Sequence, residues 1–387
     1  MFLKFAAAPI TLFGYGCRKE LPALLKREQK RHALIVTDQG LEAVGIRKQV
    51  SDLLEEEGIA CTVYNQVLPN PTLKNVEEGT ELYKKKHCDF IVAVGGGSAN
   101  DCAKAIRMLS VNPGKLKYYE GGNKSNVKGP LLVAVNTTAG TASEVSRAYL
   151  INDDKEKKKM IFKDDFVMPD IAVNDTEFMI KLPKHITAQT GMDALTHAVE
   201  SYLSTTGTVF TNMLAEDSIR IIWKWLPEAF RDGSNEEARD QMALGQYLAG
   251  LSFGSAGLGL VHAMAHQLGA LYSLPHGLCN AILLPPVLKL YCTKQIGLVG
   301  KIARILTPGK TGDLSEKELD LQSIEMLEKF SERLNTKKDL KSLGVKKSDF
   351  MLLADKTLED GCLATAPYKP AIEEVKEIFE SVYGEGR

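Results

Sequence analysis

Patterned cysteines are missing from this sequence. Seven cysteines occur in 387 residues, the count is odd, and no two of them form a Cys-x-x-Cys pair. Scattered single cysteines argue against a disulfide framework and against a thiolate zinc site, and they favour a reducing compartment. We therefore expect a cytoplasmic protein.

Long apolar runs are also missing. No stretch approaches the roughly 18 uninterrupted apolar residues of a transmembrane helix, so we expect no membrane partner. The N-terminal segment MFLKFAAAPITLF is apolar, but Lys4 interrupts it and no clear small-residue cleavage site follows. It is predicted to form the first strand of the fold and not a signal peptide.

An excess of charge of either sign is absent. The 48 lysines and arginines balance 49 aspartates and glutamates, which gives a formal net charge of -1. This balance provides no electrostatic footprint for nucleic acid, so we expect no nucleic-acid partner. The densest basic run, residues 155–159, contains Glu156 and follows Asp153 and Asp154. It predicts a solvated turn.

The first half of the chain alternates between strand and helix patterns. Four short apolar runs predict buried strands: 33–38, 60–65, 90–98 and 131–141. Three intervening segments have apolar residues at helical spacing: 41–57, 73–86 and 99–109. This alternation favours a mostly parallel sheet with helices on both faces.

The pattern changes at Leu182. Six segments after this point have helical periodicity: 185–203, 208–231, 235–252, 257–272, 316–334 and 371–383. No convincing strand pattern occurs among them, so the second half is predicted to be helical. At about 150 residues per domain, the chain suggests two domains, for which we predict residues 1–180 and 181–387.

A glycine-rich loop lies where a predicted strand meets a predicted helix. It contains three glycines and a serine, Gly95 to Ser98. Backbone amides at a helix N-terminus, with no Cβ in the way, can hold a pyrophosphate. The loop lacks the spacing of both the GxGxxG fingerprint and the Walker motif, and a simple tight turn is the alternative. Its position between strand and helix favours phosphate binding.

Two more features follow predicted strands. Asp38 ends the first clear strand, where an acid can bind ribose hydroxyls and repel a 2′-phosphate, which favours NAD over NADP. An N-cap or turn aspartate is the alternative. The loop NTTAGTASE, residues 136–144, offers short hydroxyl donors for phosphate or nicotinamide, or it is an ordinary polar loop.

Four of the seven histidines fall in three short motifs. Asp193 and His197 are four positions apart on a predicted helix and share a face, and His262 and His266 repeat this spacing. His276 follows on a predicted loop. Each pair alone fits a hydrogen-bonded core pair, but three motifs in small apolar surroundings favour a metal site. One carboxylate with several imidazoles suits iron, zinc, cobalt or nickel more than magnesium or calcium.

Together these motifs resemble those of the iron-containing (group III) alcohol dehydrogenases. The likeness is carried by GGGSANDCAKA, NTTAGTASEVS, GMDALTHAVESY and HAMAHQLGALYSLPHG. It is strongest to the branch that holds 1,3-propanediol dehydrogenase and NAD-dependent methanol dehydrogenase, and it is weakest after residue 300. The resemblance implies a dehydroquinate synthase-like fold: an α/β Rossmann-like N-terminal domain, an all-α C-terminal domain, and an active site in the cleft between them.

Matched position by position, the resemblance implies a role for each site residue. His266 would lie beside the nicotinamide and assist proton transfer, and Phe253 would line the substrate pocket. The metal ligands would be Asp193, His197, His262 and His276. The cofactor-binding positions would be Asp38, Asn70, Gly96, Gly97, Ser98, Asp101, Thr137, Thr138 and Lys159.

The chain departs from this branch at three places. Ala99 and Asn100 stand where proline and histidine or isoleucine are common. Gly254 to Ala256 replace an asparagine-rich stretch, and Ala366 to Tyr368 replace an Asn-Pro-Arg segment. The last two departures concern the substrate pocket and leave the exact alcohol open.

The resemblance implies a homo-oligomer, a dimer or larger, that transfers hydride between NAD(H) and a small primary alcohol or aldehyde. One divalent metal would assist, with Fe2+ implied by the family and Zn2+ left open. A lyase or polyol-phosphate dehydrogenase on the same fold is the alternative. Its substrates need basic residues, and the segments around Asp193, His262 and His276 contain no arginine or lysine. A non-catalytic metal-binding protein would need no dinucleotide site.

Overall fold

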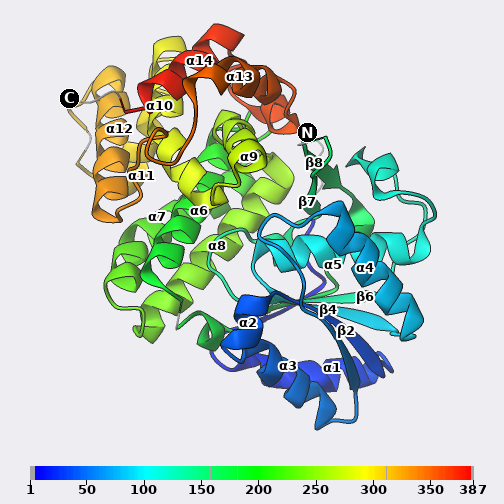
Figure 1. The fold of residues 1–387 in the computed structure, drawn as a ribbon. Helices are drawn as coiled ribbons and strands as arrows, with labels where there is room; N and C mark the ends of the chain where they lie inside the picture. Colours follow the sequence, from blue (N-terminus) through cyan, green and yellow to red (C-terminus); the bar gives the residue numbers. More distant parts are fainter. Residues whose placement is uncertain (1–4, 157, 181, 311, 385–387) are drawn as a thin grey trace. The chain divides into compact units, whose positions relative to one another are not determined.

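The computed structural model describes residues 5–156, 158–180, 182–310 and 312–384. The chain forms two compact units, which divide between Lys181 and Leu182. Figure 1 colours the chain along the sequence and labels the helices and strands of each unit. Part of the predicted N-terminal strand, residues 1–4, lies outside the described residues.

The first unit is built on a six-stranded sheet with the order β1-β9-β6-β4-β2-β3. All neighbouring strands in it are parallel. The strands are β1 (Ile10–Phe13), β2 (His32–Val36), β3 (Ala60–Tyr64), β4 (Phe90–Gly95), β6 (Leu131–Asn136) and β9 (Ile171–Asn174). The four strands expected over 33–38, 60–65, 90–98 and 131–141 are therefore present as β2, β3, β4 and β6, and the predicted parallel α/β fold is confirmed.

Helices cover both faces of this sheet (Figure 1). They are α1 (Leu21–Arg27), α2 (Gln39–Ala43), α3 (Ile46–Glu55), α4 (Leu73–Lys85) and α5 (Gly97–Val111). The single helix predicted over 41–57 is two helices, because Gly45 has a φ of 78°. This left-handed backbone suits glycine and ends α2 before α3 begins.

Two apolar layers hold the helices to the sheet. Leu34 and Ile91 lie in one buried cluster with residues of α4 and α5. Ile35 and Val92 lie in the other, with residues of α1 and α3. Successive strand residues point to opposite faces, and both faces are covered. The strands are therefore continuous apolar runs and do not alternate with polar residues.

A second, small sheet was not expected from the sequence. It contains β5 (Gly121–Gly122), β7 (Ala148–Asp153) and β8 (Lys158–Lys163) in the order β5-β8-β7. The basic run predicted as a solvated turn does form a turn over residues 154–156, but from Lys158 it is strand. The lysines of β8 made its two-residue period hard to recognise in the sequence. In the structure Met160 and Phe162, which are two positions apart, are both buried.

The second unit is helical, and no strand occurs among its described residues. Its helices are α6 (Lys184–Leu203), α7 (Val209–Arg231), α8 (Glu236–Ala256), α9 (Leu260–Tyr272), α10 (His276–Lys294), α11 (Gly300–Leu306), α12 (Glu316–Arg333), α13 (Phe350–Leu358) and α14 (Ile372–Ser381). The predicted all-α second half is therefore confirmed. The helix expected to start at residue 257 begins at Leu260, because Gly257 has a φ of 78°.

One site-bearing helix was predicted wrongly. His276 was expected on a loop, but it is the first residue of α10. Pro275 precedes it, and Pro285 and Pro286 lie inside the helix. Proline in a helix interior normally argues against a helix, which is why the sequence did not reveal α10.

Helix α6 lies at the centre of the second unit and packs against α7, α8 and α10. Its glycine Gly191 permits close approach, since a Cβ there would lie 2.3 Å from Leu226 on α7. The helix is buried along most of its length. A helix buried on all sides needs a particular reason to carry polar residues, and α6 carries Asp193, His197 and Glu200.

No single helix in the described part of the chain has both the length and the apolar character needed to cross a bilayer. The pair α8 and α9 meets these criteria only when taken together, with a bend of 103° between them.

The buried Arg107 provides a test of the first unit. Its guanidinium donates to Asp170 and to the carbonyl of Met168, both at 2.7 Å. Replacement of Arg107 by Met should lower the free energy of unfolding by about 3–5 kcal/mol, because buried polar groups lose their partner. Urea unfolding followed by circular dichroism measures this change.

The control uses the same carboxylate. Lys128 also pairs with Asp170 at 2.7 Å, but its side chain is 54% exposed. The Lys128→Met variant should therefore change the free energy by about 0–1 kcal/mol. Equal effects of the two substitutions would contradict this account.

Candidate functional site

Four side chains that could hold a metal ion converge inside the helical unit. They are Asp193 and His197 of α6, His262 of α9 and His276 of α10. One ligand atom from each lies within 4.8 Å of the other three. The side chains of Asp193 and His262 are almost fully buried, and that of His276 is 25% exposed. The cluster therefore joins three helices and has one more open side.

Local sequence explains how these helices meet. Asp193 and His197 are one helical turn apart and share a face of α6. Gly277 follows His276, and a Cβ at this position would lie 2.1 Å from the carbonyl oxygen of Gln189 on α6. Only glycine permits this approach, so Gly277 allows His276 to reach the cluster.

Three of the ligand atoms share one hydrogen-bond partner. The amide nitrogen of Asn280 lies 2.6 Å from Asp193 Oδ1 and 3.2 Å from the Nε2 atoms of both His262 and His276. Because these three atoms all lie close to one nitrogen atom, they face a common place. A set of acceptors arranged in this way fits a divalent cation.

The charges of the cluster support this assignment. Burial disfavours a charged Asp193, but the surrounding His197, His276 and His262 hold its pKa well below the usual range. Burial lowers the pKa of His262, whereas the nearby carboxylate of Asp193 and the hydrogen bond to Glu200 outweigh this and raise the pKa to about 9. The carboxylate is therefore ionised and the surroundings favour positive charge, as a cation site requires.

Phe253 of α8 lies against the cluster. Its ring stacks on His197 with 4.5 Å between centroids, and His197 stacks on His262 at the same distance. The aromatic ring thus gives one side of the cluster an apolar wall.

His266 lies on α9 one turn after His262. Its ring is 5.4 Å from that of His276, and it is not among the four converging residues. His266 Nδ1 lies 2.9 Å from Asp360 Oδ2. His266 lowers the pKa of Asp360, although burial opposes this. Since the ionised carboxylate can only accept, Nδ1 carries a proton, and Nε2 is the acceptor atom of the neutral ring.

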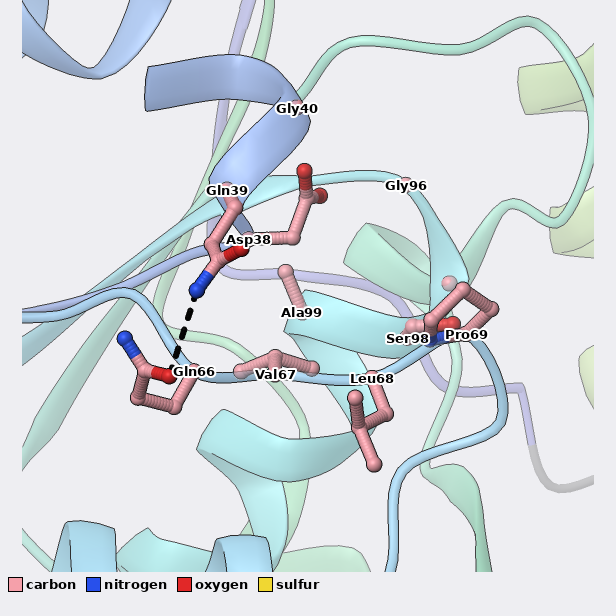
Figure 2. A pocket seen from close by; sticks show the side chains of 11 residues that line it. Asp38, Gln39, Gly40, Gln66, Val67, Leu68, Pro69, Gly96, Ser98 and Ala99 are labelled. Carbon is pink, nitrogen blue, oxygen red and sulfur yellow. Dashed lines mark hydrogen bonds between the residues drawn. The ribbon is translucent and has the colours of Figure 1, made fainter. Parts of the chain in front are cut away.

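Four of the nine predicted cofactor positions line a cavity in the first unit. This cavity has a volume of about 500 Å³, and Asp38, Gly96, Gly97 and Ser98 all line it. Figure 2 shows the segment from Gln66 to Pro69 along one side and Asp38, Gly40 and Gly96 along the other. Its size is ordinary for a small-molecule site.

The glycine loop forms the turn from β4 into α5. Gly95 has a φ of 153°, and a Cβ there would lie 2.7 Å from that of Ala99. The side-chain amide of Asn100 donates to the carbonyls of Gly95 and Gly96 at 3.2 and 3.0 Å. The loop is held from its carbonyl side, and the first amides of α5 have no acceptor within the helix. This is an anion-binding arrangement.

Asp38 is the N-cap of α2, which was one of the two roles suggested by its sequence position. Its Oδ1 accepts from the amide of Leu41 and caps α2. The same residue lines the cavity. The cap occupies Oδ1, and Oδ2 is the oxygen that remains for a ligand hydroxyl.

The remaining predicted cofactor positions lie outside the cavity lining, and some of them contact the glycine loop. The amide of Asn70 lies 3.4 Å from Ser98 Oγ, and Lys159 donates to Asn70 at 3.1 Å. A Cβ on Gly96 would meet Thr138 Oγ1 at 2.9 Å, whereas Thr137 is buried. None of Asn70, Asp101, Thr137, Thr138 and Lys159 lines the cavity itself.

Asp101 instead joins α5 to Ser143 and to Leu150 of β7. It accepts from Ser143 Oγ at 2.9 Å and from the amide of Leu150 at 3.1 Å. The buried Lys104 donates to the same Ser143 hydroxyl at 2.8 Å. Burial lowers the pKa of Lys104 to about 8, against the opposite effect of Asp101 and Glu144.

Comparison with known proteins identifies the family. The family model described as iron-containing alcohol dehydrogenase matches residues 8–176, and its C-terminal counterpart matches residues 187–383. The chain belongs to the iron-containing alcohol dehydrogenase family. It is therefore an oxidoreductase of the alcohol dehydrogenase type.

Similar members of this family come from fungi and bacteria. Alcohol dehydrogenase 4 of Schizosaccharomyces pombe is 45% identical over 97% of this chain and 88% of its own length. The NAD-dependent methanol dehydrogenase of Bacillus methanolicus is 35% identical over 97% of this chain and 99% of its own. A solved 1,3-propanediol oxidoreductase has a TM-score of 0.95 at 36% identity, covering 99% of this chain and 100% of that one.

Three residues that contact the site were not singled out from the sequence of this alcohol dehydrogenase. Glu200 is seven positions after Asp193 and three after His197, so helical spacing was a usable signal for it. Asn280 is one turn after His276, but the missed helix α10 concealed this. Asp360 is 94 positions from His266, and no local pattern connects the two.

Gly277 provides a test of the cluster geometry. In the Gly277→Ala variant the new Cβ must displace α10 from α6, so His276 moves away from Asp193. We expect affinity for Co2+, measured by competition with a chelator, to fall about tenfold or more. Gly254→Ala is the control, because a Cβ there would meet nothing within 4 Å. Co2+ affinity that stays at the wild-type value in both variants would refute the role of Gly277.

Proposed function

We propose that this protein transfers hydride between NAD(H) and a small primary alcohol or its aldehyde, assisted by one divalent metal. Asp193, His197, His262 and His276 would hold the metal, which is Fe2+ by family, with Zn2+ as the other ion that suits these ligands. The observation that carries the proposal is the convergence of these four ligand atoms within 4.8 Å.

The names of the relatives support this reaction class. The methanol dehydrogenase is named as NAD-dependent, and other relatives are named for 1,3-propanediol and lactaldehyde. All of these compounds are short alcohols or aldehydes. The proposed substrate is accordingly a small molecule with a primary alcohol or aldehyde group.

The chain's own residues perform positioning and proton handling. When bound, the metal supplies a Lewis acid for the alcohol oxygen and NAD supplies the hydride acceptor. His266 is proposed to assist proton transfer, because Nδ1 is held by Asp360 and Nε2 can accept a proton. Phe253 keeps water from one side of the cluster through its stacking on His197.

We assign the cavity of the first unit to the dinucleotide. Gly96, Gly97 and Ser98 would contact the pyrophosphate through backbone amides, and Asp38 would bind ribose hydroxyls. Thr138, Asn70 and Lys159 adjoin this loop through the contacts described above. Asp101 and Thr137 would act mainly as support, and the compact unit from Phe5 to Lys181 would be the dinucleotide-binding domain.

A phosphate-bearing substrate, as in a polyol-phosphate dehydrogenase, is not favoured. Residues 186–203 and 253–288, which carry the four proposed ligands, His266 and Phe253, contain no lysine or arginine. Recognition of phosphate or carboxylate normally needs such cations. The apolar wall at Phe253 suits an uncharged substrate better.

We also propose a cytoplasmic homo-oligomer. None of the seven cysteines forms a disulfide, which suits a reducing compartment. Val209 and Met213 at the start of α7 are 80% and 63% exposed. They lie one turn apart, and an apolar pair of this kind on the surface suits contact with another subunit.

A substrate screen tests the proposal. The expected result is NADH oxidation with short aldehydes and much slower oxidation with phosphorylated ones, in a sample that contains about one Fe2+ or Zn2+ per chain. The His262→Ala variant should lose bound metal and activity together. Full activity in a verified metal-free sample would contradict the proposal.

Asp38 gives a separate prediction about the cofactor. In Asp38→Ser the hydroxyl can still cap α2, but the negative charge is gone. The preference for NADH over NADPH, measured as the ratio of kcat/KM values, should fall about tenfold or more because charge repulsion is removed. An unchanged ratio would show that Asp38 is only a helix cap.

A further inference from the structure

Glu200 is a buried carboxylate that none of the proposed roles uses. It lies on α6, on the face that carries Asp193 and His197, and it is only 3% exposed. In the described part of the chain no lysine or arginine pairs with it. A buried carboxylate needs compensating partners, and all those of Glu200 come from the first turn of α9.

These partners are two backbone amides and one imidazole. Glu200 Oε1 accepts from the amide of Val261 at 2.7 Å, and Oε2 lies 3.3 Å from the amide of His262. Oε2 also lies 2.6 Å from His262 Nδ1. The amides belong to the positive end of α9, which favours a negative group.

The fold makes room for this carboxylate. A Cβ on Gly259 would lie 2.8 Å from Glu200 Oε1 and 3.5 Å from the hydroxyl of Tyr291. Gly259 is the residue before α9. Its lack of a side chain therefore allows Glu200 to reach the first amides of the helix.

The contact between Glu200 and the His262 imidazole has a chemical consequence that the contacts with the backbone amides do not have. Both oxygens of Glu200 act as acceptors for backbone amides, so in a neutral His262 the proton that Oε2 accepts sits on Nδ1. The lone pair is then on Nε2, which lies 3.8 Å from Asp193 Oδ1 in the ligand cluster. The other tautomer would present N–H to a cation and could not bind it.

We propose that Glu200 is the positioning residue of the metal site, which fixes the metal-binding tautomer and the orientation of His262. This inference rests on the proposed assignment of His262 as a ligand. Glu200 acts through His262 and does not itself touch the metal. Groups of this kind typically set metal affinity.

The test compares two buried carboxylates in the helical unit of the full-length chain. Glu200→Gln removes the charge and offers an amide that cannot accept from both Val261 and His262. Asp320→Asn is the matched control, since Asp320 is 2% exposed and accepts from the amides of Gly297 and Gly300 at 2.7 and 2.6 Å. Among the described residues no hydrogen bond joins Asp320 to an imidazole.

Each metal-free variant is titrated with Co2+ against a chelator, and its thermal midpoint is recorded. Glu200→Gln should bind Co2+ about 10- to 100-fold more weakly than wild type, with an altered visible spectrum. Asp320→Asn should lose thermal stability but keep the wild-type affinity and spectrum. Equal Co2+ affinity in the two variants would overturn the proposal.

A second measurement needs no variant at position 200. In metal-free wild-type protein with 15N-labelled histidine, the His262 signal is identified by its loss in His262→Ala. It should show the proton on Nδ1, and a proton on Nε2 alone would overturn the proposal. If wild type bound no Co2+, or if His262→Ala bound it equally well, the ligand assignment would fail instead.

Discussion

The structure of the helical unit depends on the burial of Asp193. A carboxylate inside a helical core is costly unless positive or hydrogen-bonding groups surround it, and here His197, His262 and His276 provide those groups. The requirement explains why a helix buried along most of its length carries polar residues at all. It also explains why α9 and α10 must approach α6 closely, which Gly259 and Gly277 permit.

The electrostatic requirement in the first unit is different, because the group to be bound there is an anion. The glycine loop contains no charged side chain, and its capacity for an anion comes from backbone amides at the start of α5. Such amides can bind an anion only when the loop is held in place, and the side-chain amide of Asn100 holds it by donating to the carbonyls of Gly95 and Gly96. Asn100 thus gives a physical role to a position at which this chain departs from its relatives.

The two sites have a common construction. In each, the groups that would touch a ligand are few, and a further layer of buried polar residues determines their orientation. Glu200 and Asp360 form hydrogen bonds with the Nδ1 atoms of His262 and His266. The side-chain nitrogen of Asn280 contacts the proposed ligand atoms of Asp193, His262 and His276. Affinity and specificity in such a site depend on this supporting layer as much as on the contacting atoms.

Periodicity alone determined much of this protein. Strands such as 90–95 and helices such as α6 are evident in the sequence, because backbone geometry repeats every two or 3.6 residues. The four-residue spacing of Asp193 and His197 likewise follows from one helical turn. For features that depend only on residues close together along the chain, the sequence was sufficient. These features are the α/β first half, the helical second half and the glycine turn.

Only the tertiary structure decided the rest. Asp360 lies 94 residues from His266, and Glu200 lies 62 residues from His262, so chain proximity gave no sign of either contact. Helix α10 was concealed by Pro285 and Pro286, whose cost is met by packing that a single segment does not reveal. Which atom of an imidazole faces a cation is decided by its distant hydrogen-bond partner, and no local pattern contains that information.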